Sequence, residues 1–181
     1  MDKYYLNEDE YDEGIPSIIT YLDESKPFPS FVDRYFSRFY CKRTSENGDN
    51  EDHLILFHTN GVCLISIAKS HIAFKKGIES VNFDIGNCDR SQNQVKGKHK
   101  KGAMNLQKNT TVALIKTLDG TEYKLFSCIV GKLLEVNESL NDDIKKLEVE
   151  GHGYIAVVLP KMSNAGKERE SLITDTDYIP S

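Results

Sequence analysis

The chain has 181 residues, of which 39% are hydrophobic and 28% charged, and its formal charge is −5 at pH 7. This length suits one domain, and the composition supplies enough apolar side chains for one compact core but few beyond it. No apolar run approaches the roughly 18 residues of a membrane-spanning helix, so we expect a soluble protein of the cytosol or nucleus.

The cysteines are scattered and form no C-x-x-C pair: Cys41, Cys63, Cys88 and Cys128. The first 25 residues contain no apolar segment typical of a secretion signal. We therefore expect reduced thiols in a protein that stays inside the cell.

An acidic segment opens the sequence. Residues 1–24 contain eight acidic side chains and one basic side chain, so the segment has a formal charge of −7. Because it shows little apolar periodicity, residues 1–28 are predicted to be an acidic, largely flexible N-terminal arm. Its mixture of acidic and apolar residues is also typical of segments that fold on a partner or on a basic surface of their own chain.

SFVDRYFSRFY, residues 30–40, predicts a short amphipathic helix. Ser30 and Asp33 have the spacing of a capping box at its start. Its apolar and aromatic side chains share one helical face: Val32, Tyr35, Phe36 and Phe39. Such a helix either covers the domain core or presents its aromatic side chains, Tyr35, Phe36 and Phe39, to a groove in a partner.

Beyond the polar insert at 42–52 the pattern predicts strands. Two apolar segments meet at Asn60-Gly61, a pair typical of the type I′ hairpin turn because both residues tolerate positive φ. A second hairpin is predicted at 111–126 with its turn at Asp119-Gly120. YIAVVLP, residues 154–160, predicts a last strand before a polar C-terminal tail at 162–181, also expected to be flexible.

Two β units of the sequence resemble each other weakly. VKGK at 95–98 precedes the strand VALI at 112–115, and IVGK at 129–132 precedes IAVV at 155–158. Two similar β motifs around a pseudo-twofold axis are the arrangement of a barrel-sandwich hybrid. With the many short strands and tight turns, this pattern predicts a mostly-β domain at 29–161.

Several segments, in this order and at these spacings, resemble the Abitram (actin-binding transcription modulator) family: FVDRYFSRFY, EDHLILFHTNGVCLISIAKSH, VKGKHKKGA, FSCIVGKLLEVNESL and GYIAVVLPK. The resemblance runs from Pro29 to Lys161. It implies a domain like the glycine-cleavage H-protein and a non-enzymatic, actin-binding protein that modulates actin assembly and transcription. It also implies presence in the nucleus, in nuclear speckles, and in the cytoplasm, including actin-rich cell projections. Nuclear transcription or RNA-processing proteins would then be further partners.

GKLLEVNESL, residues 131–140, is similar to the strand that follows the cofactor-bearing hairpin in the H-protein and in lipoyl and biotinyl carriers. In those carriers the modified lysine stands at the hairpin apex, from which it can reach other active sites. Here Asp119-Gly120 occupy the apex, and Lys116 and Lys124 lie on the arms. We therefore expect the carrier fold without a cofactor; the alternative is a modified lysine at Lys116 or Lys124.

Other kinds of chemistry find little support in the sequence. Cys63 and Cys128 lie in apolar segments, where a buried, unreactive thiol is the common state. His53 and His58 are five residues apart and point to opposite faces of a strand. No H-x-x-x-H or C-x-x-C spacing is present, so we expect neither a metal site nor an enzyme.

KGKHKKG, residues 96–102, predicts an exposed basic loop with these candidate binding residues: Lys96, Lys98, His99, Lys100 and Lys101. The loop could bind the acidic surface of actin, contact nucleic-acid phosphates or serve as a nuclear import signal. It could also simply pair with the acidic arm of its own chain. No aromatic residue lies between Gln92 and Lys108 to stack on bases, which favours actin over nucleic acid.

Overall fold

The computed structural model describes residues 28–86, 88–93, 95–97, 100–161 and 165–180. All helices and strands named below belong to one compact unit, Phe31–Ser181. Apart from Phe28, the predicted acidic arm lies outside the described residues, as do Lys98 and His99 of the predicted basic loop.

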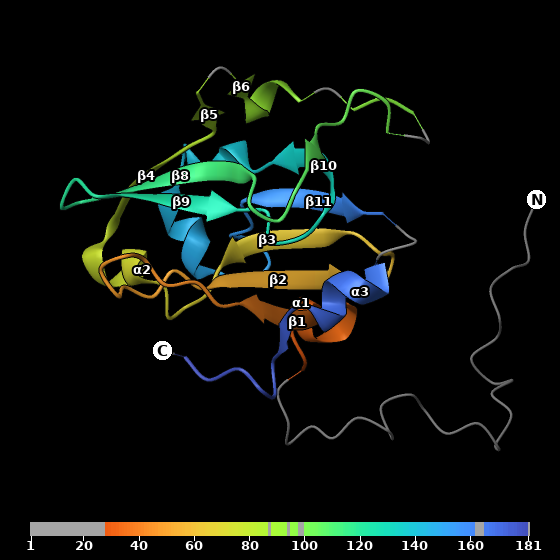
Figure 1. Ribbon diagram of the computed structural model, residues 1–181, viewed down its shortest axis with the longest axis horizontal. Helices are drawn as coiled ribbons and strands as arrows, with labels where there is room; N and C mark the ends of the chain where they lie inside the picture. The colour runs from red at the N-terminus through yellow and green to blue at the C-terminus, as the bar shows by residue number, and fades with distance from the viewer. Residues whose placement is uncertain (1–27, 87, 94, 98–99, 162–164, 181) are drawn as a thin grey trace, which may run out of the picture. The chain divides into compact units, whose positions relative to one another are not determined.

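The described residues are mostly β, as predicted. The largest sheet has the strand order β12-β1-β2-β3-β11-β10-β7, and every neighbouring pair is antiparallel. In the same order these strands are Ile173–Thr174, Phe36–Cys41, His53–His58, Cys63–Ile67, Ala156–Pro160, Gly131–Val136 and Asn105–Leu106 (Figure 1). The specific barrel-sandwich arrangement and its pseudo-twofold axis stay predictions.

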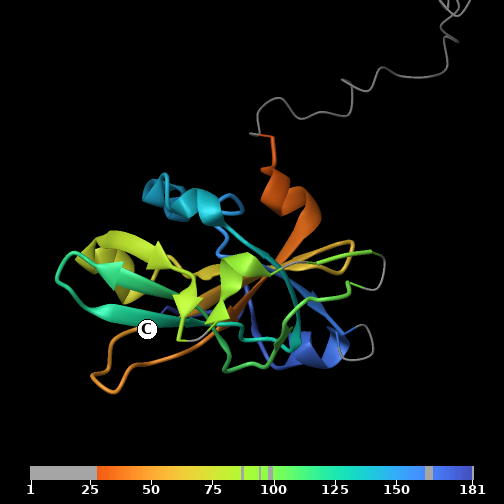
Figure 2. The same cartoon turned by 90° about the horizontal axis from the view of Figure 1, so that it is seen from above.

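A second sheet has the order β4-β8-β9, and a short ribbon joins β5 to β6. These strands are Ile78–Asn82, Thr111–Thr117, Glu122–Phe126, Asp84–Ile85 and Cys88–Asp89. The helical elements are α1 (Phe31–Tyr35), α2 (Ile72–Lys76), α3 (Ala165–Glu170) and the 3-10 turns η3 (Arg90–Gln92), η4 (Glu138–Leu140) and η5 (Ile144–Glu148). Figure 2 shows α2 and the turn of the β8–β9 hairpin at the same end of this unit.

The main core is built from residues of both larger sheets. Ile55 and Ile65 contribute from the seven-stranded sheet, and Ile115 and Leu125 contribute from β8 and β9. All of these side chains are fully buried, which is the main source of stability for a domain of this size.

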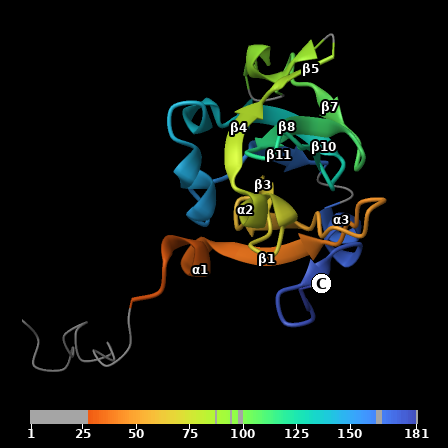
Figure 3. The same cartoon turned by 90° about the vertical axis from the view of Figure 1, so that its left-hand side faces the viewer.

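A smaller cluster lies on the other face of β2. Leu54 and Leu56 alternate with the core residues of this strand and contact Val32 of α1, with Phe36 packed beside them. Because both faces of β2 are covered, the strand is apolar along its length rather than alternating. Figure 3 shows α1 leading directly into β1.

Both predicted hairpins are confirmed, but the type I′ turn at Asn60-Gly61 is wrong. The Gly61 N–H donates to the His58 carbonyl at 3.0 Å, and the His58 N–H donates to the Val62 carbonyl at 2.9 Å. The loop therefore has three residues, and Gly61, with φ of 91°, is its left-handed residue. Asn60 is not at positive φ; its side chain instead accepts a hydrogen bond from the Val62 N–H.

The β8–β9 turn has the same construction. The Gly120 N–H donates to the Thr117 carbonyl at 2.8 Å, and Gly120 has a φ of 83°. Asp119 accepts from the Thr121 N–H at 3.0 Å, as Asn60 accepts from Val62 in the first hairpin. In both turns an Asx side chain fixes the loop, and only the glycine needs positive φ.

The predicted helix at 30–40 is wrong beyond Tyr35. Phe36–Cys41 form β1, which pairs with β2 from Phe36 opposite His58 to Cys41 opposite His53. Aromatic residues favour strands, and pairing with the apolar β2 outweighs the local helical period. Because side chains alternate along a strand, Phe36 packs into the smaller cluster and Phe39 against the main core.

The polar C-terminal segment adds a short strand, β12, to the seven-stranded sheet. The sequence pattern had placed the end of the domain earlier, at residue 161. β12 pairs with β1, with Thr174 opposite Phe39 and Ile173 opposite Tyr40. The ring of Tyr178 stacks on that of Tyr40 with 3.7 Å between centroids. The described residues 165–180 therefore cover the edge of β1.

His53 joins the two larger sheets. Its Nδ1 lies 2.8 Å from the Glu51 carbonyl, and its Nε2 accepts a hydrogen bond from the Phe126 N–H, at the end of β9, at 2.9 Å. This combination requires the neutral imidazole with the proton on Nδ1. Burial lowers the pKa of His53 to about 3, and burial lowers the pKa of the neighbouring His71 to about 4.

We expect acid to destabilise the protein through these two histidines. Below pH 6.5 the unfolded chain binds protons that the folded chain cannot accept, so the free energy of unfolding falls as pH decreases. Between pH 6.5 and about 4 each histidine should contribute about 1.4 kcal/mol per pH unit.

Urea unfolding at several pH values measures this slope. His53→Gln and His71→Gln should each reduce it. An unchanged slope in the His53→Gln/His71→Gln double variant would contradict the assignment.

Gly131 permits the close approach of β10 and β11. A Cβ at this position would lie 2.6 Å from the Leu159 carbonyl oxygen and 2.7 Å from a Val158 methyl carbon. Gly131→Ala should therefore lower the free energy of unfolding by roughly 1–3 kcal/mol, because backbone must shift to admit the methyl group. Gly166→Ala in α3, where the Cβ meets nothing within 4 Å, is the matched control and should not destabilise. Equal stability of the two variants would contradict this reading.

Candidate functional site

Lys96, Gly97, Lys100 and Lys101 of the predicted basic loop form the base of a hairpin. Lys96 and Lys101 exchange backbone hydrogen bonds of 3.0 and 2.9 Å, and the Lys100 N–H donates to the Gly97 carbonyl at 3.1 Å. Lys100 has a φ of 51°, an uncommon value for a residue with a Cβ. Lys96 and Lys101 are exposed, as predicted, while Lys100 is half-buried. The structure thus holds the lysines at its base in a defined backbone conformation.

Asn93 fixes the chain that leads out of this hairpin. Its side-chain nitrogen donates to the Leu133 carbonyl at 2.8 Å, and its side-chain oxygen accepts from the Met104 N–H at 3.0 Å. Met104 in turn accepts a hydrogen bond from the Leu133 N–H through its carbonyl, and Leu106 then pairs with Gly131. These contacts place the basic hairpin beside β10.

A groove of about 650 Å³ lies next to Lys100, and we call it the basic groove. It is lined by these residues of the hairpin and of β7, β10, β11 and their ends: Lys100, Asn105, Leu106, Gln107, Val130, Gly131, Lys132, Leu159, Pro160 and Lys161. Its apolar lining comes from Leu106, Val130, Leu159 and Pro160. These described lining residues include three lysines and no carboxylate.

Strand pairing assembles the basic groove from distant parts of the sequence. Lys132 lies opposite Leu159 in β11 and opposite Asn105 in β7, while Lys161 directly follows β11. Lys132 and Lys161 were not predicted as site residues, because they lie far along the chain from KGKHKKG. The available signal was that one predicted strand begins at GK and another ends at PK, but their adjacency is a tertiary property.

The second predicted binding surface, Tyr35, Phe36 and Phe39, is not one surface. Tyr35 is 47% exposed at the end of α1, and its ring lies 6.1 Å from that of His58. Phe36 packs edge-to-face on His58 at 4.8 Å, whereas Phe39 packs on Phe57 at 5.2 Å on the opposite face of the strand. Tyr35 and Phe36 thus lie together against His58, but Phe39 lies on the other face of β1, so the three side chains do not form one docking surface.

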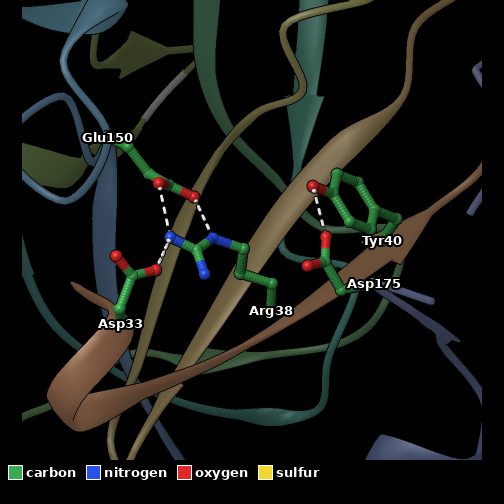
Figure 4. Close-up of polar contacts among 5 residues, drawn as sticks. All are labelled: Asp33, Arg38, Tyr40, Glu150 and Asp175. Atoms are coloured by element: carbon green, nitrogen blue, oxygen red, sulfur yellow. Dashed lines mark hydrogen bonds and ion pairs between the residues drawn. The ribbon is translucent and has the colours of Figure 1, made fainter. Parts of the chain in front are cut away.

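Another surface pocket, of about 350 Å³, is lined by a network of polar side chains that includes Arg38, Tyr40 and Tyr178. The Arg38 guanidinium donates to both oxygens of Glu150, at 2.6 and 2.8 Å, and forms an ion pair with Asp33 at 2.6 Å (Figure 4). The hydrogen bond to Glu150 is the largest cause that raises the pKa of Arg38.

Tyr40 and Tyr178 extend the same network. The Tyr40 hydroxyl donates to Asp175 at 3.1 Å (Figure 4), and burial raises the pKa of Tyr40 to about 12. The Tyr178 hydroxyl donates to Asp52 at 2.7 Å. These polar groups satisfy one another and join α1, β1 and the C-terminal segment, so we read the pocket as structural.

The hairpin that would carry a cofactor in a carrier domain turns at Leu118–Gly120, close to the predicted Asp119-Gly120 apex. Lys116 forms an ion pair with Glu79 at 2.8 Å, and Lys124 lies opposite Leu114 on the other arm. The absence of a cofactor stays a prediction.

Among the described residues, no group of three or more His, Cys, Asp or Glu side chains is arranged to hold a metal ion. His53 and His71, whose ring centroids are 6.3 Å apart, use ring nitrogens to bind backbone groups instead. Within the same part of the chain, no helix has the length and apolar character to span a membrane.

No model of a protein family matches the chain. Individual proteins match over most of its length. The Abitram protein of Drosophila melanogaster is 44% identical over 182 residues, which cover 98% of this chain and 82% of the relative. The Homo sapiens Abitram protein is 42% identical over 155 residues, or 83% of this chain and 85% of the relative. The Dictyostelium discoideum Abitram protein is 33% identical over 153 residues, or 82% and 86%. The chain therefore belongs to the Abitram family.

Proposed function

We propose that this chain is a non-enzymatic actin-binding protein that modulates actin assembly and transcription, and that the basic groove with its adjoining hairpin is the actin-binding surface. The observation that carries the proposal is the convergence of three lysines, Lys100, Lys132 and Lys161, around an apolar lining. The resemblance stated in the sequence analysis supplies the identity of the partner.

The chemistry of the groove suits an acidic protein surface. Lysines at its margins would attract carboxylates over about 10 Å at moderate salt and speed the encounter. Val130 and Leu159, which are half-buried, would then contact apolar side chains of the partner, and removal of this area from water would lengthen the lifetime of the complex.

The same resemblance supports a place for the protein in the nucleus, including nuclear speckles, and in the cytoplasm with its actin-rich projections. Lys96 and Lys101 are exposed on the hairpin, where an import receptor could bind them. Nuclear transcription or RNA-processing proteins are the further partners that this proposal includes.

A nucleic-acid-associated nuclear factor is the second candidate. The three lysines that line one groove favour it, because they could contact successive phosphates. The described lining contains no aromatic side chain, however, so bases would find no stacking surface there. Because a stacking surface is missing from this lining, we rank actin above nucleic acid as the partner.

Reversal of the groove charges should weaken actin binding. Lys100→Glu/Lys101→Glu/Lys161→Glu should raise the Kd for actin by roughly 10-fold or more, because attraction to an acidic surface becomes repulsion. Filament co-sedimentation and the assembly rate of fluorescent actin measure the effect.

The matched control is Lys75→Glu/Lys124→Glu/Lys145→Glu, which makes the same change in net charge at exposed positions outside the groove. It should retain binding. Equal loss in both variants would mean that total charge matters and the groove does not, and no binding by the native chain would remove the actin proposal.

RNA binding is compared in the same way. At one salt concentration the native chain should bind actin more tightly than single-stranded RNA, since the groove offers charge without stacking. Fluorescence anisotropy with a labelled oligonucleotide measures the second affinity. Tighter RNA binding that the groove variant abolishes would put the nucleic-acid candidate first.

Intact mass tests the carrier alternative. Protein purified from cells that contain lipoyl and biotin ligases should have the mass of the plain 20.5 kDa chain. An added lipoyl or biotinyl group that Lys116→Arg or Lys124→Arg removes would show that the chain is a modified carrier.

A further inference from the structure

The outer face of the seven-stranded sheet carries apolar side chains beside the basic groove. Side chains alternate along β3 and β11, so one face of these strands holds the main core and the other lies outside it. On the outer face Leu64 lies opposite Leu56 of β2 and opposite Val157 of β11. Strand pairing therefore places three aliphatic side chains in one row across three strands.

A second row lies two residues further along each strand. Leu159 follows Val157 on β11, and Val62 precedes Leu64 of β3, so each pair of side chains shares a face. The antiparallel pairing of β3 with β11 brings Val62 beside Leu159. We call these four aliphatic side chains the outer apolar strip: Val62, Leu64, Val157 and Leu159.

Helix α1 covers only part of this outer face. Val32 of α1 contacts Leu54 and Leu56 of β2, which are 6% and 1% exposed. Leu64 packs at the margin of the same cluster, but all four side chains of the outer apolar strip are half-buried. Three neighbouring strands span about 10 Å, which is the width of one helix. The face therefore accepts one helix from its own chain and has room for another beside it.

Charged residues mark the two ends of the outer apolar strip. At one end Lys132 lies opposite Leu159, and Lys161 directly follows β11. At the other end Glu135 lies opposite Val157. A helix laid along the strip would match these charges if its acidic residues met the two lysines.

The strip can bind a partner only through side chains. β3 lies between β2 and β11, and β11 lies between β3 and β10, so both strands already have a neighbour on each side. Their backbone groups are used in these ladders, which leaves no place for a further strand between them. A helix satisfies its backbone internally and offers one apolar face, which suits such a surface.

We infer that the outer apolar strip is the docking site for an amphipathic helix of a partner protein, whose acidic residues lie at the end that meets Lys132 and Lys161. Such a helix presents apolar side chains at positions i, i+3, i+4 and i+7. The inference deepens the proposed function, because the strip shares Leu159 with the basic groove, and it rests on that function for the identity of the partner.

A synthetic helix tests the inference without actin. The probe is a fluorescein-labelled peptide of about 15 residues with leucines on one helical face, glutamates in its first turn and lysines in its last. The full-length chain should bind it in fluorescence anisotropy. A peptide of the same composition in scrambled order should bind roughly 10-fold more weakly or less, because its leucines share no face. Equal affinity for the two peptides would overturn the inference.

A conservative variant removes apolar area from the strip. Val62→Thr/Val157→Thr keeps a β-branched side chain at both positions, which lie outside the described lining of the basic groove. It should bind the helical peptide roughly 10-fold more weakly. Leu118→Gln is the matched control, since Leu118 is a 72% exposed aliphatic residue on the β8–β9 turn, and it should bind as the native chain does. Undiminished binding by the threonine variant would contradict the assigned site.

The lysine end is tested by charge. Lys132→Gln/Lys161→Gln should weaken binding of the same peptide roughly 5-fold and reduce its dependence on salt. Lys75→Gln/Lys145→Gln makes the same change in net charge at exposed positions away from the strip and should have little effect. An equal effect of the two variants would overturn the assignment of this end.

Methyl NMR of the native chain locates the site without a variant. Addition of the helical peptide should shift the methyl signals of Val62, Leu64, Val157 and Leu159 and leave those of Leu118 in place. Shifts confined to other methyl groups would overturn the inference. So would burial of the strip in a dimer of this chain, or a stronger response of its methyl groups to vesicles of anionic phospholipid than to the peptide.

The peptide and actin experiments fail separately. Peptide binding at the strip by a chain that does not bind actin would remove the proposed function and leave the helix site. Actin binding by a chain that does not bind the helical peptide would remove the helix site alone.

Discussion

One buried neutral imidazole connects the parts of this protein. His53 uses one ring nitrogen toward the Glu51 carbonyl, at 2.8 Å, and the other to accept the Phe126 N–H at the end of the second sheet. Removal of the ring would leave a buried backbone N–H without a partner and would loosen the junction between the sheets. The Phe126 ring at this junction also contacts Arg43, whose guanidinium lies 4.0 Å from the ring centroid.

Local chemistry explains which elements could be predicted. Gly61 and Gly120 mark both hairpins because each turn needs one left-handed residue, and the predicted strand at 154–160 matches β11 within two residues. The helix at 30–40 fails beyond Tyr35 because pairing with β2 is worth more to Phe36 and Phe39 than helical periodicity is.

The candidate sites show the same division between local and tertiary information. A cluster of lysines in seven consecutive residues is visible in KGKHKKG, but Lys132 and Lys161 join it only when β10 and β11 pair.

The last strand has a further consequence, for the choice of protein fragments. β12 and Tyr178 cover β1, whose edge would otherwise present unpaired backbone groups beside Phe39 and Tyr40. A fragment that ended at Lys161, where the apolar pattern stops, would contain every long strand and still expose an aromatic, open edge. Such edges recruit strands from other chains, so that fragment would associate and precipitate although its core was complete. The C-terminal residues, although polar in sequence, therefore complete the sheet at this edge.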